Sequence, residues 1–175
     1  MKISNFKNKI IYIAEFSLPN MSAYAVHVLK MCDSFSVNNK VELIIPFKDN
    51  KYSFGKIKKN YNLKNRFVIR GIFNSKSKLN LFYRIIFALK IKNYLNNIQY
   101  KMILSRSIIS SLILGFFNVK NILEIHTELT GVTKKIFNLR NTKNIYKNLK
   151  YIVLNSNLTN ILKLKKSKTI VIGDA

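Results

Sequence analysis

Short apolar runs alternate with longer amphipathic segments along the whole chain. The first run, residues 10–14 (IIYIA), is unbroken, which is typical of a strand that is covered on both faces. Later runs have a similar length and composition and also favour strands. The pattern therefore predicts strands at residues 10–14, 41–45, 66–72, 102–104, 122–125, 151–154 and 169–172.

Helices are predicted between these strands. Ser22 is a suitable N-cap, and apolar residues recur after it at helical spacing as far as Phe35. Residues 47–65 are polar and weakly patterned, so we expect a loop there, and residues 129–149 form a basic amphipathic region. The other helices are expected at residues 79–95, 108–117 and 158–164.

This alternation of strands and helices predicts the fold class. It favours a parallel sheet with right-handed crossovers and helices on both faces. No internal repeat or low-complexity linker divides the chain. We therefore expect residues 1–175 to form a single Rossmann-like, doubly wound α/β domain with a mainly parallel sheet.

Composition and charge leave several functions open, whereas the hydrophobic pattern predicts one fold class. With 48% apolar residues, the chain has enough hydrophobic side chains for a core, which excludes a disordered basic tail. Its formal net charge of +24 favours polyanions such as anionic lipid, nucleic acid or phosphorylated substrates. The lysines are spread over many segments, so a solvated lysine-rich surface explains the charge equally well.

Several classes of protein lack their signature in this sequence. There is no phosphate-binding GxxxxGK[ST] loop, no GxGxxG after the first strand and no GxSxG elbow. Two histidines and one cysteine are few for a zinc site, so we expect no metal and no cofactor. The lysines and aromatic residues of 51–67 could stack on RNA, but the rest of the chain lacks an RNA-binding pattern, so nucleic acid is not an expected partner.

The cellular compartment is inferred from two observations. Cys32 has no second cysteine to pair with and lies in an apolar helical pattern, which favours a core position in a reducing cytoplasm. The most apolar stretch, residues 102–119, is interrupted by Arg106 and is better explained by a strand and a helix than by a membrane span. We expect a cytoplasmic protein, with the inner face of the membrane as a candidate docking surface.

Candidate binding residues follow from the predicted topology. In an open α/β sheet, ligands bind outside the carboxyl ends of the strands, near the point where the strand order reverses. Polar residues follow most of the predicted strands directly. They are Glu15, Ser17, Asn20, Ser105, Arg106, His126, Thr127, Glu128, Asn155, Ser156 and Asp174.

The segment LEIHTE, residues 123–128, is the sharpest local feature. Glu124 and His126 are two residues apart, so on a strand they point to the same face, where they must pair or line a cavity. His126 could bind a sugar hydroxyl or titrate near neutral pH, or it could be tied to a neighbouring carbonyl. Arg106 suits a phosphate or carboxylate, or a structural ion pair. His27 is interpreted as a histidine packed on a helix face.

Five segments together resemble a known family. SLPNMSAYAVHVLKMCDSFSVNNKVELIIP, MILSRS, ILEIHTE, YIVLNSNLTNIL and KTIVIGDA are similar, in this order, to segments of family-4 glycosyltransferases. The resemblance extends over essentially the whole chain. It implies the N-terminal half of a GT-B architecture, in which two Rossmann-like domains face each other across a cleft.

The resemblance also implies roles for individual residues. His126 matches the family's histidine near the transferred sugar, and Arg106 a polar position beside it. Asn20 and Ser22 belong to the loop before the first helix, which here lacks the glycine pair of many relatives. His126 is the expected catalytic residue, and substrate-binding roles are expected for Asn20, Ser22, Arg106, Glu128, Asn155 and Ser156.

The function implied is that of an acceptor-side domain. The full enzyme would transfer sugar from a nucleotide sugar with retention and without a metal, onto a sugar or lipid-linked acceptor for polysaccharide or glycolipid synthesis. Since the donor-binding half is expected to be absent, we expect a truncated chain that is inactive alone or acts with a separate donor-domain chain. The alternative is a non-catalytic Rossmann-like module that binds a polyanion, a nucleotide or a protein.

Overall fold

A computed structural model describes residues 9–76 and 80–173 of the chain. Its described strands form one sheet in which every pair is parallel, so the predicted doubly wound α/β class is confirmed. The order of the strands is β2-β3-β1-β5-β6-β7-β8. Strand β4 is not part of this path and also pairs with β3. The strands are β1 (Lys9–Ile13), β2 (Ser17–Leu18), β3 (Lys40–Lys48), β4 (Val68–Phe73), β5 (Met102–Ser105), β6 (Asn121–Ile125), β7 (Leu149–Val153) and β8 (Thr169–Val171).

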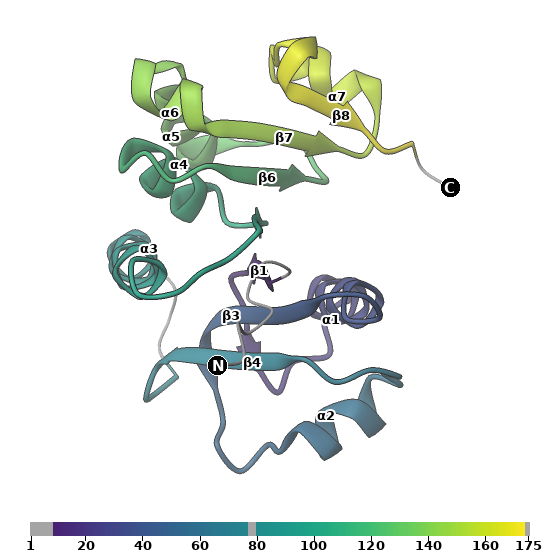
Figure 1. Ribbon diagram of the computed structural model, residues 1–175. Coiled ribbons are helices and arrows are strands. Elements are labelled where there is room, and N and C mark those ends of the chain that lie inside the picture. The colour runs from purple at the N-terminus through teal and green to yellow at the C-terminus, as the bar shows by residue number, and fades with distance from the viewer. Residues whose placement is uncertain (1–8, 77–79, 174–175) are drawn as a thin grey trace, which may run out of the picture.

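Helices cover both faces of this sheet. Figure 1 shows α1 on one side of β1 and α3 on the other, with α4, α5 and α6 on the same side as α3. The strand order reverses between β1 and β5, which places the predicted ligand-binding crevice at their carboxyl ends. The helices are α1 (Ala23–Phe35), α2 (Phe54–Asn60), α3 (Leu81–Leu95), α4 (Ile108–Phe116), α5 (Gly131–Phe137), α6 (Lys143–Asn148) and α7 (Ser156–Ile161), with short 3-10 turns η2 (Asn138–Asn141) and η3 (Lys166–Lys168).

Strand β1 is apolar throughout because both of its faces are buried. Ile10 and Tyr12 pack into the cluster under α1, whereas Ile11 and Ile13 pack into the cluster under α3. A third cluster lies around β6 and β7, with Phe137 and Tyr151 in edge-to-face contact. Burial on two faces explains the unbroken run in the sequence.

Helix α1 begins and packs as its sequence predicts. The Ser22 hydroxyl accepts a hydrogen bond from the Ala25 amide at 3.2 Å and so caps the helix. Val28, Leu29 and Cys32 then face the sheet and are fully buried. This packing fixes the first turns of α1 beside the carboxyl ends of β1 and β5.

The prediction of a loop at residues 47–65 was wrong. This segment contains helix α2, which Ser53 caps by accepting a hydrogen bond from the Lys56 amide. Ile57 is the buried residue of this short helix, and it packs with Tyr61 and Phe67 against the cluster under α1. A helix that buries a single apolar residue leaves no periodic pattern, so its sequence resembles that of a loop.

Other predicted boundaries shifted by a few residues. Strand β3 continues through Pro46 to Lys48, where it pairs with β2. The helix predicted at residues 158–164 begins earlier and covers Ser156–Ile161. Leu79, the predicted start of the helix observed as α3, lies outside the described residues. The basic region at residues 129–149 contains α5, η2 and α6.

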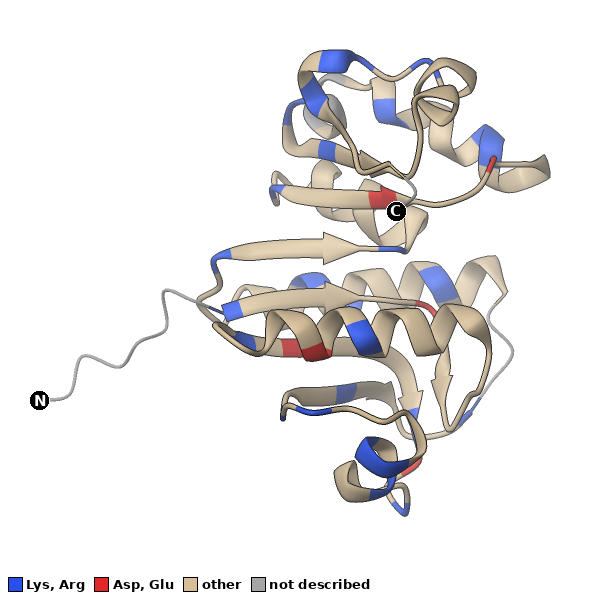
Figure 2. Ribbon diagram, turned by 90° about the vertical axis from the view of Figure 1, so that its right-hand side faces the viewer, with Lys and Arg blue, Asp and Glu red and all other residues tan. Residues whose placement is uncertain are grey.

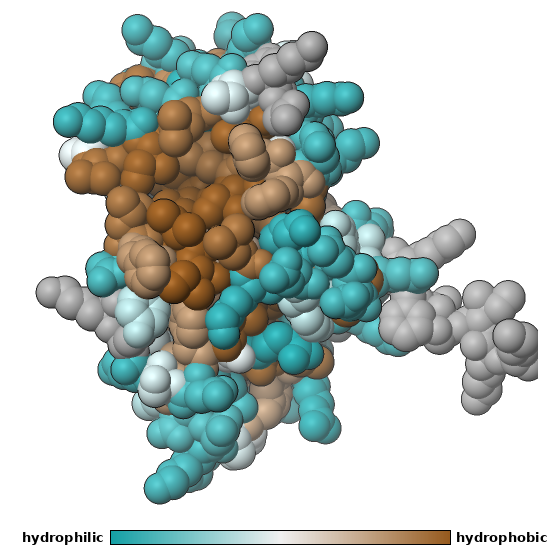
Figure 3. Space-filling model, turned by 90° about the vertical axis from the view of Figure 1, so that its left-hand side faces the viewer, coloured by the Kyte–Doolittle hydropathy of each residue, from teal (hydrophilic) through white to brown (hydrophobic). Residues whose placement is uncertain are grey.

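The surface combines dispersed charge with one apolar face. Figure 2 shows lysine and arginine distributed over many elements rather than gathered on one. Figure 3 shows a large, hollowed apolar patch on the side of α3 and α4. Within the described residues, no helix has both the length and the apolarity needed to cross a membrane.

Candidate functional site

A cavity of about 520 Å³ lies beyond the carboxyl ends of β5 and β6, beside the first turns of α1. This is the edge of the sheet at which the topology predicts a ligand. Its position places residues from three separate segments around one space. The lining residues are Ala23, Tyr24, His27, Arg106, Ile108, Glu124, Ile125, His126, Thr127 and Leu129.

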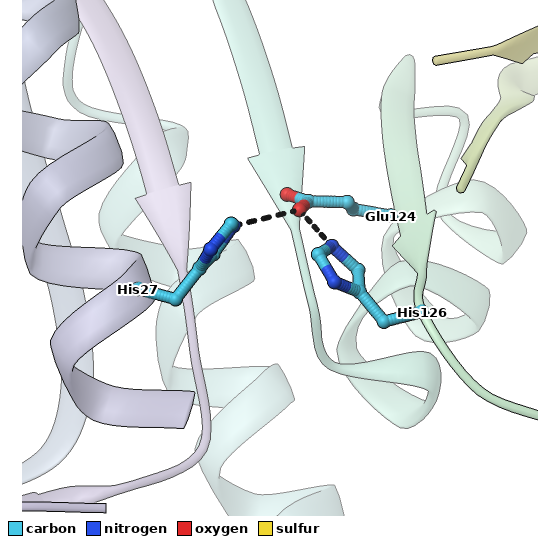
Figure 4. A group of neighbouring side chains, drawn as sticks. All are labelled: His27, Glu124 and His126. Carbon is cyan, nitrogen blue, oxygen red and sulfur yellow. Dashed lines mark hydrogen bonds and ion pairs between the residues drawn. The ribbon is translucent and has the colours of Figure 1, made fainter. Parts of the chain in front are cut away.

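Two histidines approach the same carboxylate in this cavity (Figure 4). Glu124 and His126 leave the end of β6 on one face, and the His126 Nε2 is hydrogen-bonded to the Glu124 Oε1. His27 comes from α1, and its Nε2 lies 3.7 Å from the same oxygen. The two imidazole rings are nearly perpendicular, with centroids 5.0 Å apart.

The second oxygen of Glu124 is held from inside the sheet. The fully buried Tyr12 of β1 donates its hydroxyl hydrogen bond to the Glu124 Oε2. Burial and the neighbouring carboxylate raise the pKa of Tyr12 well above its ordinary value, so it remains a neutral donor. This contact fixes the carboxyl group and leaves Oε1 directed toward the histidines.

The charges in the cavity follow from burial and from these contacts. Burial alone would raise the pKa of Glu124, but hydrogen bonds from His126 and Tyr12 and the charge of Arg106 outweigh it and lower the pKa. Desolvation and then the charge of Arg106 lower the pKa of His27. At neutral pH the site therefore combines an ionised Glu124 with a neutral His27.

Arg106 supplies a positive charge to the cavity lining. Its backbone amide donates to the Ile13 carbonyl at 2.9 Å, which ties the loop after β5 to the end of β1. Its guanidinium carbon lies 4.6 Å from the centre of the Tyr24 ring. The buried Arg106 Nη1 has no hydrogen-bond partner among the described residues. A buried donor left without a partner is costly, and an anionic or hydroxyl-bearing ligand would satisfy it.

Glu15 lies in a second, smaller hollow, which shares Arg106 with the cavity. Glu15, Arg84 and Arg106 line this hollow of about 70 Å³ together with residues of α4 and α5. The Ser107 hydroxyl donates to Glu15 at 2.6 Å, and the Arg84 Nε lies 3.4 Å from its other oxygen. Burial raises the pKa of Glu15, against the lowering effects of Ser107 and Arg84.

Two predicted binding residues stabilise the local chain before α1. The Asn20 side-chain oxygen accepts from the Ser22 amide at 2.8 Å, and the Asn20 carbonyl accepts from the Tyr61 hydroxyl. Ser22 is the N-cap described above. Neither side chain is part of the cavity lining. Their contact with a substrate stays a prediction.

The other predicted residues lie farther along the same edge. Glu128 is exposed, and Asn155 caps α7 by accepting a hydrogen bond from the Leu158 amide at 2.9 Å. Ser156 is exposed at the first position of α7. None of these three lines the cavity, and Asp174 is outside the described residues. The structure thus brings Arg106, His126 and Thr127 together around the cavity, whereas Glu128, Asn155 and Ser156 lie outside its lining.

His27 packs against a neighbour from a helix face, as expected, but it also belongs to the cavity. It is not simply packed on a helix face, because it lines the cavity, contacts the His126 ring and reaches Glu124. The sequence position of His27, five residues after the Ser22 cap, could have indicated that it lies near the ligand-binding edge of the sheet. The first turns of a helix that follows a parallel strand lie at the carboxyl edge, and Tyr24, three residues before His27, faces the same cavity.

Comparison with known proteins supports the fold and leaves the family open. No protein-family model matches the chain, and no curated protein is significantly similar to it in sequence. The structure is similar to that of a glycosyltransferase from Rickettsia africae ESF-5, with 15% identity and a TM-score of 0.59 over 96% of this chain and 44% of that one. The chain has a GT-B-like fold.

A second solved structure has the same architecture. UDP-GlcNAc 2-epimerase from Neisseria meningitidis, determined with UDP-GlcNAc bound, matches 93% of this chain with 10% identity and a TM-score of 0.58. The present chain covers 45% of that protein, so it spans less than half the length of either neighbour. At such identities the likeness describes the fold, and the chemistry has to be argued from the site.

Proposed function

We propose that the chain is the acceptor-side domain of a retaining, nucleotide-sugar-dependent glycosyltransferase of the family-4 type. The observation that carries the proposal is one cavity lined by both His126, which is held by the buried Glu124, and Arg106, whose buried Nη1 has no partner among the described residues. The cavity lies at the edge where an α/β sheet binds its ligands, and the GT-B-like fold is consistent with this use.

His126 is the residue proposed to contact the acceptor sugar. Glu124 is ionised, so its carboxylate favours a proton on the His126 Nε2. The imidazole then presents Nδ1 as an acceptor for a sugar hydroxyl. Arg106 would donate to an anionic group on the substrate. Both residues orient the acceptor, while the donor phosphate needs a second wall to stabilise it as it leaves.

A complete cleft is required for this chemistry. Retaining transfer holds the acceptor hydroxyl against the anomeric carbon while the nucleotide departs, and residues on one wall cannot do both. We therefore expect negligible sugar transfer by the purified 175-residue chain. Sugar transfer from a nucleotide sugar by this chain alone would overturn the proposed division of labour.

Activity should return when a donor domain is supplied, either fused to the chain or as a separate chain. In such an enzyme, His126→Ala should lower kcat by about 100-fold, as expected when the acceptor hydroxyl is no longer held in position. Val132→Ala is the control, since Val132 is exposed, is absent from the cavity lining and has no predicted role in binding. Unchanged turnover of the His126 variant would give His126 a structural role.

The acceptor is proposed to be lipid-linked because an apolar hollow adjoins the cavity. This hollow, of about 350 Å³, lies in the apolar patch of Figure 3. Ile109 and Ile136 line both this hollow and the small one beside Glu15, which in turn shares Arg106 with the cavity. An anionic headgroup at Arg106 could therefore continue into an apolar chain. The apolar hollow is lined by Leu81, Ile85, Ile109, Leu112, Ile113, Phe116, Ile136, Leu139 and Ile145.

A lipid-linked acceptor places the protein at the membrane surface. The net charge of +24 would attract it to anionic lipid, so the chain should bind anionic vesicles more strongly than neutral ones. Ile85→Ser and Phe116→Ser, which add polar groups to the hollow, should weaken this binding more than Val37→Ser, at an exposed residue outside it. Equal binding to neutral and anionic vesicles would remove the membrane part of the proposal.

A further inference from the structure

The chain contains two histidines, and both reach the same buried carboxylate. His27 comes from α1, whereas Glu124 and His126 come from the end of β6, so residues far apart in the sequence converge on one point. One potential ligand atom from each of the three lies within 4.8 Å of the others. Two imidazoles and a carboxylate form a ligand set that binds zinc in proteins.

We propose that His27, Glu124 and His126 form a binding site for a divalent transition-metal ion of the zinc class. The expectation of no metal site rested on the small number of histidines and cysteines. A carboxylate supplies the third ligand here, so two histidines are sufficient. Three protein ligands leave a fourth position, and the cavity lies where that position would open.

The observed spacing is close to that of a bound ion. Bonds of about 2.0–2.2 Å in a tetrahedral site place ligand atoms roughly 3.3 Å apart. The His27 Nε2 lies 3.7 Å from the Glu124 Oε1, which needs little adjustment. His126 is hydrogen-bonded to that same oxygen and has to withdraw from it to admit an ion. The proposal requires the side chain of His126, which lies in the loop after β6, to rotate away from this oxygen.

The surroundings both favour and oppose the ion. The buried Tyr12 holds the Glu124 Oε2, which orients the carboxylate as outer hydrogen bonds do in metal sites. Arg106 opposes binding, since its positive charge lines the same cavity as the three proposed ligands and repels a cation there. Removing the charge of Arg106 should therefore tighten metal binding. Removal of a metal ligand would instead weaken metal binding, so the two kinds of variant have opposite expected effects.

The test uses the 175-residue chain, prepared without a histidine tag. We expect one Zn²⁺ per chain by titration calorimetry, and a visible absorption spectrum of four-coordinate Co²⁺ in the same site. His27→Ala and Glu124→Gln should each weaken Zn²⁺ binding by at least about 100-fold, and Tyr12→Phe by about 10-fold, the lower end for an outer-shell partner. Arg106→Gln should strengthen it. Glu128→Gln, an exposed carboxylate beside the site, should leave it unchanged.

Each outcome bears on the site directly. Circular dichroism and thermal unfolding of every variant separate loss of ligands from loss of fold. Failure of the folded wild-type chain to bind one Zn²⁺ would overturn the proposal. So would binding that His27→Ala leaves intact, or that Arg106→Gln weakens. The experiment measures the isolated domain and needs no transferase activity, so its result is independent of the proposed function. If both hold, Zn²⁺ and the acceptor compete for His126.

Discussion

Two buried glutamates lie on opposite faces of the sheet, and their partners differ in kind. Glu42, on the α3 side, is surrounded by permanent donors. Lys9 and Arg70 form ion pairs with it, and the Tyr94 hydroxyl lies 2.9 Å from both carboxylate oxygens. Arg70 also lies over the Tyr94 ring, at 4.4 Å from its centre. Each oxygen of Glu42 is thus satisfied by groups of the protein itself.

Glu124, on the α1 side, has partners that can be exchanged. Tyr12 and His126 form hydrogen bonds with it, and an open cavity lies beside it. Arg106 lines the same cavity, and one of its buried donors has no partner in the part of the chain that the structure describes. A ligand could satisfy Arg106 and His126 without breaking the contact between Tyr12 and Glu124. Such incomplete pairing beside an open volume is what a binding site requires.

The direction of the pKa shift does not distinguish the two groups. Burial alone would raise the pKa of Glu42, but hydrogen bonds from Lys9, Arg70 and Tyr94 outweigh it and lower the pKa. The pKa of Glu124 is lowered in the same way. What separates them is the geometry around the carboxylate. A shifted pKa therefore supports a functional role only where unpaired donors and open volume accompany it.

The comparison predicts its largest effect at Glu42. Glu42→Ala would remove a carboxylate that is 1% exposed and leave three donors without their acceptor. We expect a loss of about 2–4 kcal/mol in the free energy of unfolding, measured by urea denaturation at pH 7. Glu128→Ala, at an exposed position, should change it by less than about 0.5 kcal/mol. Equal losses in the two variants would mean that the Glu42 network is not structural.

The network around Glu42 should also make the free energy of unfolding depend on pH in the acid range. A carboxyl group whose pKa is lower in the folded state stabilises the protein above its unfolded pKa of about 4.3. That stabilisation is lost as the pH falls through the lower, folded value. The free energy of unfolding should therefore decline as the pH falls below about 4.3, and Glu42→Gln should reduce this decline because it removes one of the groups responsible. A decline of the same size in wild type and variant would assign the acid sensitivity elsewhere.

The sequence correctly predicted those site residues whose positions depend only on the topology of the sheet. Apolar runs located the strands, and the rule for parallel sheets then placed Arg106 and His126 at one edge, where they share a cavity. The same rule selected Asn155, although it follows β7, which is separated from β5 by β6. The rule identifies an edge and not a distance along it. Asn155 serves there as a helix cap.

The hydrophobic pattern of the sequence could not predict which side chains contact each other across different elements. The spacing of α1 explained His27 as a packed residue, because periodicity reports which face of a helix is apolar and not what lies opposite each residue. Helix α2 was missed because one buried isoleucine, Ile57, makes no period. Glu42 forms ion pairs with residues of β1 and β4 and accepts a hydrogen bond from a residue of α3. No pattern in the sequence specifies the register that brings these three elements together.

Glu15 provides the smallest and most discriminating test of the comparison, because it combines features of both glutamates. Like Glu42 it has an arginine beside it, and like Glu124 it lines a hollow, but burial raises its pKa. A raised pKa means that the charged form is penalised in the folded state, so Glu15→Gln should stabilise the protein at pH 7, by up to about 0.5 kcal/mol. The Ser107 hydroxyl can still donate to the amide oxygen that replaces the carboxylate. The gain over wild type should shrink as the pH falls through the raised pKa and Glu15 takes up its proton. Urea unfolding of both proteins at pH 7 and pH 4.5 measures this difference, and a variant less stable than wild type at pH 7 would place Glu15 with Glu42 as a structural carboxylate.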